Sequence, residues 1–203
     1  MRLPHSILLS LLMAARPTAA QSPTGTFGWH LGGGIEAVRF GHVAVSQAVP
    51  GVPAEVRPTP RPALHLTVGR AMGHWRVDLE TGWAGGYLEA GNDVLAVQDK
   101  GAQVARYRLG LAIARRVATT GSGTIELALM PTLDLWSVDG DGRVRAGAEG
   151  QMVLRVPLGA VELVNRLSAG LSGNPIQAED LGDVSDLRGL RALSVGIGLR
   201  FPI

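Results

Sequence analysis

The sequence predicts an all-β fold, namely a closed, antiparallel, up-and-down transmembrane β-barrel of about eight strands. Apolar and polar residues alternate with a period of two in eight segments, which is typical of strands with two different faces. No segment approaches the ~20 consecutive apolar residues that a membrane-spanning helix requires, so strands must carry any membrane crossing. Many of the 28 glycines fall on the polar face, and small side chains suit the narrow interior of such a barrel.

The first 20 residues have the pattern of a secretory signal peptide. Arg2 gives a positive start, residues 6–15 form a short apolar run, and Thr18-Ala19-Ala20 supplies small residues before a cleavage point. We therefore predict a signal peptide over 1–20, a short linker over 21–25 and a barrel domain over 26–203.

The remaining chain is electrically balanced. The predicted leader holds Arg2 and Arg16 and no acidic residue, which leaves 17 of the 19 basic residues against 17 acidic ones. This balance, without any basic run, argues against nucleic-acid binding, which concentrates positive charge on one face. Because the chain has no Cys, neither disulfides nor a lipid-bearing cysteine are expected.

The first four alternating segments lie in the N-terminal half. Segment 27–37 alternates aromatic and aliphatic residues with glycines, and the shorter segment 64–69 alternates aliphatic residues with polar ones and glycine. Segment 75–87 is the clearest internal strand, because five large apolar residues share one face while Arg, Asp, Glu and Gly share the other. Segment 106–113 sets one Tyr and three aliphatic residues opposite two arginines. A helix would mix these faces.

The other four segments repeat the pattern. Segment 125–135 contains Pro131, which cannot donate to a ladder, so we expect a bulge, a bend or a strand end there. Segment 144–156 sets Val, Ala, Met and Leu opposite Arg, Glu and Gln, and segment 161–171 repeats this with one Asn in its apolar row. Segment 192–203 alternates without exception up to the C-terminus. All four therefore predict strands with one apolar face.

The connections between these segments predict the orientation of the barrel. Membrane barrels have short turns on one side and longer loops on the other, and both termini should lie on the short-turn side. The odd connections then form the external loops, which we expect over 38–62, 88–102, 137–142 and 172–189. The even connections form the turns, over 70–73, 115–123 and 157–159.

Charges of both signs lie on the polar face, which suggests that this face points inward. They can pair across neighbouring strands, and the planar guanidinium of Arg suits bidentate pairing with carboxylates. The predicted interior charge network comprises Arg76, Asp78, Glu80, Arg106, Arg108, Glu126, Glu149, Arg155, Glu162 and Arg166, with Glu36, Asp134 and Arg145 on the same face. A core filled in this way would leave no wide water channel.

Aromatic residues on the apolar face fall near strand ends. Twelve residues separate Trp75 from Tyr87, which at ~3.3 Å each and a ~40° tilt span about 30 Å, close to the ~25 Å apolar band with its flanking girdles. The predicted girdles comprise Phe27, Trp29, Trp75 and Phe201 on the turn side and Trp83, Tyr87 and Tyr107 on the loop side. Amphipathic rings prefer these membrane interfaces.

With these features the chain resembles the small outer-membrane β-barrel family, the opacity-protein and OmpA-type barrels, over 25–203. The most specific match is the last strand, over 193–203, where alternating apolar residues run into Phe201. The resemblance implies a location in the cell outer membrane, contact with the lipid bilayer and outer-leaflet lipid, and recognition of strand 193–203 by the barrel-assembly machinery. A monomer is expected.

Some barrels of this size modify lipids, a reaction that needs a nucleophile with a base. The candidates are His42 and Ser46 in the first loop, with no third group to orient the base. His30 and His65 lie on the polar face and could bond interior carboxylates instead. We expect no catalytic residue, and a lipid hydrolase or acyltransferase remains the enzymatic alternative.

Three further motifs have simpler explanations than ligand binding. Residues 139–142 resemble the start of a calcium loop, but the twelfth position is Gly150 where a bidentate site needs Glu, so a tight hairpin turn is expected. The run 32–34 lacks the spacing of a nucleotide loop. Four acidic residues in the last loop could hold a divalent ion, although a solvated loop is the simpler reading: Glu179, Asp180, Asp183 and Asp186. No metal or cofactor is expected.

These observations predict a non-enzymatic, integral outer-membrane barrel with a filled polar interior. Its external loops, mainly the first and the last, would serve surface interaction or envelope integrity. A soluble lipocalin-like carrier of apolar ligands is a second alternative, because alternation also fits a barrel whose apolar face points inward.

Overall fold

The computed structural model describes residues 28–46, 54–59, 61–92, 96–177 and 184–203. The predicted signal peptide, the linker and Phe27 lie outside the described residues. Within the described part, no helix is long and apolar enough to cross a membrane.

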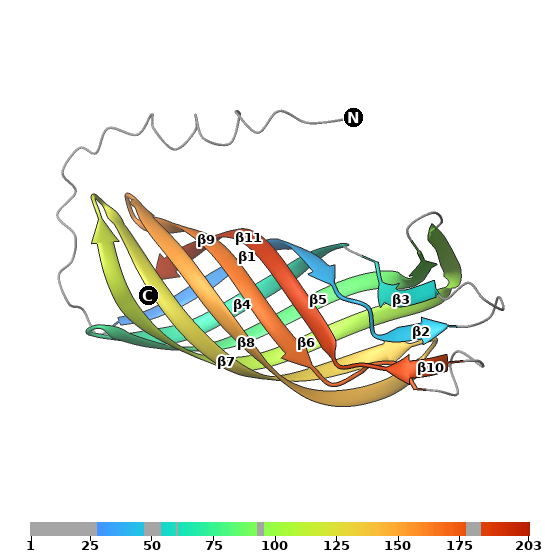
Figure 1. Ribbon diagram of the computed structural model, residues 1–203. Coiled ribbons are helices and arrows are strands. Elements are labelled where there is room, and N and C mark those ends of the chain that lie inside the picture. Colours follow the sequence, from blue (N-terminus) through green and yellow to red (C-terminus); the bar gives the residue numbers. More distant parts are fainter. Residues whose placement is uncertain (1–27, 47–53, 60, 93–95, 178–183) are drawn as a thin grey trace, which may run out of the picture.

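Antiparallel strands make up nearly all of the described chain, and the predicted all-β barrel is confirmed (Figure 1). The strands are β1 (Gly28–Phe40), β2 (Ala44–Ser46), β3 (Ala54–Pro58), β4 (Arg61–Met72), β5 (Trp75–Gly91), β6 (Ala96–Thr120), β7 (Gly123–Val138), β8 (Asp141–Leu158), β9 (Val161–Ser172), β10 (Val184–Leu187) and β11 (Leu190–Pro202). Each of the eight segments predicted from alternation corresponds to one of the long strands.

Eight long strands close into a ring. Their order around the ring is β1, β4, β5, β6, β7, β8, β9 and β11, and the pairing of β1 with β11 completes it. The first and last long strands of the barrel are thus neighbours, with Ile35 opposite Ile197. This closure leaves no free edge in the barrel wall.

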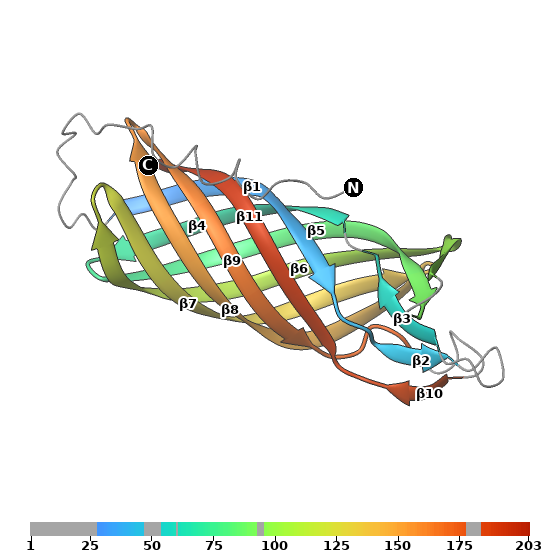
Figure 2. The same cartoon turned by 45° about the horizontal axis from the view of Figure 1, so that its top comes forward.

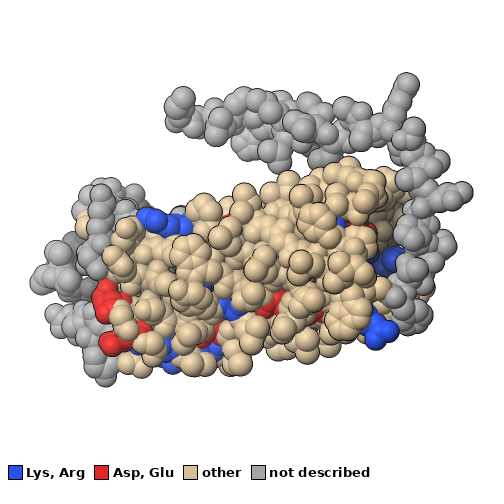
Figure 3. Space-filling model, turned by 180° about the vertical axis from the view of Figure 1, so that it is seen from behind, with Lys and Arg blue, Asp and Glu red and all other residues tan. Residues whose placement is uncertain are grey.

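The outer face of the ring is apolar and its inner face is polar. Leu79 and Ile197 are each 48% exposed, whereas the side chains of Arg76 and Arg108, on the opposite face, are buried. In Figure 3, uncharged side chains cover most of the visible wall, and charged ones show mainly toward the two ends and in a narrow line along the lower edge. The alternative of a soluble carrier with an apolar interior is therefore wrong.

Three tight turns join strands at one end, which we call the turn end. They lie at Gly73-His74, Gly121-Ser122 and Gly159-Ala160, and each glycine has a positive φ, between 56° and 69°. The second predicted turn, over 115–123, is wrong, because β6 and β7 continue to within two residues of each other. The C-terminus lies at this same end (Figure 1).

The opposite end, the loop end, contains more strand than the sequence predicted. The predicted loop over 88–102 is mostly wrong, because β5 and β6 continue their hairpin to Gly91 and Ala96. Inside the first and last predicted loops, β2, β3 and β10 add to β5 in the order β10-β2-β3-β5. Figure 2 shows these strands beyond the mouth of the barrel. The third connection is a two-residue turn at Asp139-Gly140, both with positive φ, as expected.

Pro131 does not create a register shift or a strand end. Strand β7 runs through it and pairs it with Ala148 of β8. On the β6 side, pairing holds at Gly110–Thr132 and at Ile113–Leu129 but is missing between them, where a Pro131 N–H would be needed. The proline thus interrupts one ladder without ending the strand. Register shifts occur elsewhere, between Tyr87 and Leu88 and between Arg116 and Ala118.

Glycines allow close approach of strands on the inner face. A Cβ atom at Gly198 would lie 2.6 Å from the backbone oxygen of Gly33 on β1, and one at Gly110 would lie 2.6 Å from the sulfur of Met130. Side chains at these positions would force neighbours apart, which explains why small residues are concentrated on this face.

Candidate functional site

The barrel interior holds the predicted charged residues in groups at successive heights. The group nearest the turn end links five strands through Arg76, Glu126, Arg155, Glu162 and Arg200. Arg76 Nε donates to Glu126 at 2.9 Å, and Arg155 pairs with Glu126 and also with Glu162 at 3.0 Å. Arg200 of β11 completes the chain, with its Nε 3.3 Å from Glu162.

A histidine joins the same group. Asp78 pairs with Arg76, and the Nε2 atom of His30 lies 2.9 Å from Asp78 Oδ1. His30 therefore bonds to an interior carboxylate, as its place on the polar face suggested. Alternation places Arg200 on the inner face beside Gly196 and Gly198, but its part in the network was not predicted.

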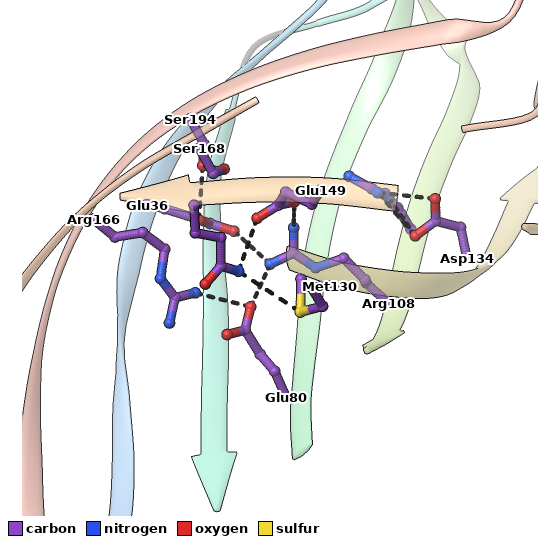
Figure 4. Close-up of polar contacts among 11 residues, drawn as sticks. Glu36, Glu80, Arg108, Met130, Asp134, Glu149, Arg166, Ser168 and Ser194 are labelled. Atoms are coloured by element: carbon purple, nitrogen blue, oxygen red, sulfur yellow. Dashed lines mark hydrogen bonds and ion pairs between the residues drawn. The ribbon is translucent and has the colours of Figure 1, made fainter. Parts of the chain in front are cut away.

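The central group is built around Arg108. Its guanidinium contacts three carboxylates from three strands: Glu149, Glu80 at 2.8 Å and Glu36 at 3.1 Å. Arg166 of β9 shares Glu80, also at 2.8 Å. Figure 4 shows these side chains pointing toward one another across the barrel. All five are buried, so the pairing is what makes their burial tolerable.

Neutral polar side chains complete this central group. Gln151 donates to Glu149 at 3.1 Å, and Ser194 donates to Glu36 at 3.0 Å. The hydroxyls of Ser168 and Ser194 lie 2.7 Å apart. His65 is also buried, and its Nδ1 atom has no partner among the described residues. The serines were not predicted to take part, although alternation placed Ser168 and Ser194 on the inner face.

Toward the loop end, the ion pair of Arg106 and Asp134 lies between the charged groups and an apolar layer. Arg106 donates through Nε and Nη2 to the two oxygens of Asp134 at 3.0 and 2.9 Å. The same guanidinium lies over the rings of Trp136 and Phe40, with its Cζ 5.5 and 5.9 Å from their centroids. These contacts fix the guanidinium between polar and apolar surroundings.

Above this pair the interior becomes apolar, which the sequence did not predict. Phe40 and Trp136 meet edge to face with centroids 5.8 Å apart. The cluster, which we call the loop-end cap, consists of Val38, Phe40, Val43, Ala44, Val56, Ala63, Ala84, Leu88, Val104, Trp136, Val138, Ile176 and Leu190. Both barrel strands and loop residues contribute to it. An entirely polar interior is therefore wrong for this end of the barrel.

Small cavities lie among the described residues of the interior. The three cavities lined by inward-facing residues have volumes of about 20, 10 and 10 Å³. Each is close to the ~10–15 Å³ that one water molecule needs.

Arg145 behaves differently from the other predicted interior charges. Its Nε donates to the backbone oxygen of Asn174 at 2.5 Å and its Nη1 to that of Val144 at 3.0 Å. It thus ties the connection after β9 to β8, with no carboxylate among the partners in the described region. Nη1 of Arg143, also on β8, donates to the backbone oxygen of Pro175 at 2.8 Å.

The predicted girdle aromatics that are described lie on the outer wall near its two ends. At the turn end, Arg70 lies over Trp29 and Arg115 over Trp75, at 5.9 and 5.5 Å from the ring centroids. Phe201 is also exposed there. Toward the loop end Trp83 faces Tyr107 across the β5–β6 ladder.

Tyr87 lies further toward the loop end. It is half-buried beneath Arg61, whose Cζ is 4.6 Å from the ring centroid. Phe27, the remaining predicted girdle residue, is outside the described chain.

The candidate catalytic and metal-binding residues do not form a site in the described regions. His42 lies with Nε2 3.2 Å from Arg188 and Nδ1 3.6 Å from Glu55, and the side chain of Ser46 is not described. No group of three metal-ligating residues occurs among the described positions. Glu179, Asp180 and Asp183 fall outside them, as does the side chain of Asp186 in β10.

Comparison with known proteins gives a clear answer only for the fold. No protein-family model matches the sequence, and no curated protein matches it. Solved structures do match. The neisserial surface protein A (NspA) gives a TM-score of 0.57 at 11% identity, over 87% of this chain and 97% of that one. The chain has the fold of the small outer-membrane β-barrels.

Two other outer-membrane barrels are similar. OprG from Pseudomonas aeruginosa gives a TM-score of 0.58 at 11% identity, over 89% of this chain and 97% of that one. The outer membrane protein AlkL, solved by solid-state NMR in DMPC lipid bilayers, gives 0.57 at 12% identity, over 94% and 97%. At 11–12% identity, this similarity shows the fold of the barrel and does not show its function.

Proposed function

We propose that the protein is an integral, non-enzymatic outer-membrane barrel with a closed interior, which acts through the structured surface at its loop end. The observation that carries this proposal is the filling of the barrel, from the paired charges near the turn end to the loop-end cap. A protein built to pass solutes through its lumen needs a continuous polar path, as in the wide barrels of porins.

The outer wall supports insertion in lipid. Aliphatic side chains cover the middle of the wall, and aromatic rings lie toward both of its ends. In water this belt would be an exposed apolar surface far larger than monomeric soluble proteins present. In a bilayer it contacts acyl chains, while Trp, Tyr and Arg reach the headgroup level.

The loop end supports a role in contact outside the cell. Strands β10, β2 and β3 continue the barrel wall beyond its mouth as a small sheet paired with β5. The backbone of Val43 accepts hydrogen bonds from the Arg188 amide and the Asn174 side chain, each at 2.8 Å. Ordered loops of this kind present a defined surface to a partner or to neighbouring envelope components.

A conductance measurement tests the closed interior. The purified protein, reconstituted in a planar bilayer, should give no steady current above the bilayer baseline at moderate voltage. Folding is checked on the same sample by electrophoretic mobility before and after boiling, since a closed barrel resists unfolding by the detergent until it is heated. A steady open-channel current from the folded protein would contradict the proposal.

A further inference from the structure

The outer wall has a groove on one side. It has a volume of about 770 Å³ and an almost wholly apolar lining, which includes Leu129, Gly150, Met152, Leu167, Ala169 and Leu193. The ladder places Leu129, Gly150, Ala169 and Leu193 side by side on four successive strands. The two small residues sit between larger ones, so the wall is hollowed over β8 and β9.

The same outer face carries two exposed arginines at its loop end. Arg39 of β1 lies opposite Leu193, so it continues the cross-strand row that forms the groove. Arg191 of β11 lies opposite Leu171 of β9, and its backbone oxygen accepts a hydrogen bond from Gly41 at 2.8 Å. The two guanidiniums therefore start from diagonal positions on adjacent strands, about 7–8 Å apart.

These arginines differ from several other arginines at the surface. Arg57 pairs with Glu89 at 2.7 Å, and Arg61 and Arg70 lie over aromatic rings. For the side chains of Arg39 and Arg191, the described residues provide neither a carboxylate nor a ring. Two outward-facing cations at the edge of an apolar wall, without a carboxylate or ring partner among the described residues, leave room for an anion that comes from the membrane.

The distance between the groove and the arginine pair fits an amphiphile, which is a molecule with an apolar chain and a charged head group. Each strand adds about 4.8 Å across the ladder, so Arg39 starts about 14 Å from Gly150, which is within the length of one extended acyl chain. Arg is suited to phosphate because its planar fork donates two hydrogen bonds to neighbouring oxygens.

We propose that this face binds a phosphorylated membrane lipid, with an acyl chain in the groove over Gly150 and Ala169 and a phosphate between Arg39 and Arg191. The inference rests on the proposed function, because it requires the wall to face lipid and the loop end to lie at a headgroup layer. A second copy of the chain is a poorer occupant, since a two-fold contact would bring the same arginines together.

Lipid A, which carries two phosphates, and the same lipid after phosphate removal are the probes. Each is titrated against the purified protein in an uncharged detergent, and retained lipid is counted by native mass spectrometry. The wild-type protein should retain lipid A in preference to the dephosphorylated lipid. The double variant Arg39→Gln, Arg191→Gln should lose this preference, with binding of lipid A weakened by about tenfold, the equivalent of about 1.4 kcal/mol.

Two further variants separate the groove from general effects. Gly150→Phe fills the groove and should weaken binding of both lipids. Arg70→Gln removes an exposed arginine at the turn end and should bind both lipids as the wild-type protein does. The boiling-dependent mobility shift is recorded for every variant, so that loss of binding is interpreted only in folded barrels.

The outcomes are distinguishable. If the arginine variant keeps its mobility shift and binds lipid A like the wild type, the lipid site is wrong while the membrane barrel stands. The same holds if free inorganic phosphate competes fully, or if Gly150→Phe changes the oligomeric mass and leaves lipid binding intact. Absence of the mobility shift in the wild-type protein would instead contradict the proposed function itself.

Discussion

Arg108 shows how a single residue is tied to the whole interior. Its guanidinium meets Glu36, Glu80 and Glu149, which are 72, 28 and 41 residues away in the sequence. Alternation alone placed all four on one face. The choice of partners could not be predicted, because it depends on which strands lie opposite one another across the barrel and on the stagger between them.

Removal of this guanidinium should be costly. Arg108→Leu leaves three buried carboxylates without their shared cation, so we expect the free energy of unfolding to fall by about 3–5 kcal/mol. Urea titration in lipid vesicles, followed by tryptophan emission, measures the change. Arg57→Leu is the matched control, because it breaks the partly exposed pair with Glu89 and should cost at most about 1 kcal/mol. Equal losses in the two variants would show that the central group does not hold the barrel together.

Strands could be predicted where the two faces differ and were missed where they become alike. Over the membrane-facing lengths, apolar residues alternate with charges and glycines, and all eight long strands were found. Near the loop end the inner face turns apolar at Val38, Phe40 and Val104, so the ends of β1 and β6 looked like loops. The short strands β2, β3 and β10 pair with partners far away in the sequence, which no local pattern reveals.

The two ends of the barrel should differ in their access from outside the cell. A short peptide tag inserted between Asp139 and Gly140 lengthens the tight turn at the loop end, and one between Gly159 and Ala160 lengthens a turn at the other end. Neither insertion disturbs a buried side chain, so both proteins should reach the membrane. Antibody labelling of intact cells should detect only the first tag, and both tags after permeabilisation. Labelling of only the second tag in intact cells would reverse the orientation.

At the scale of the whole molecule, the polarity of an ordinary soluble barrel is inverted. Ring closure pairs every long strand with a neighbour on each side, which a membrane requires because lipid offers no hydrogen bonds. The interior then holds ion pairs and glycines, and the belt of aliphatic residues on the outer wall contacts the acyl chains of the lipid. This inversion could be argued from the sequence, since small residues were concentrated on the polar face. The apolar cap could not, because Trp136 and Phe40 follow the same alternation as the charged residues below them.

The inversion is tested most directly by the tryptophans, of which Trp83 is on the outer wall and Trp136 is buried inside. Two variants each keep one of them, with the other three tryptophans changed to Phe, and are reconstituted in vesicles whose acyl chains carry bromine, a contact quencher of indole fluorescence. We expect bromine to quench most of the Trp83 emission and little of the Trp136 emission. Quenching of Trp136 as strong as that of Trp83, in a barrel that still shows the mobility shift on boiling, would contradict the assignment of the two faces.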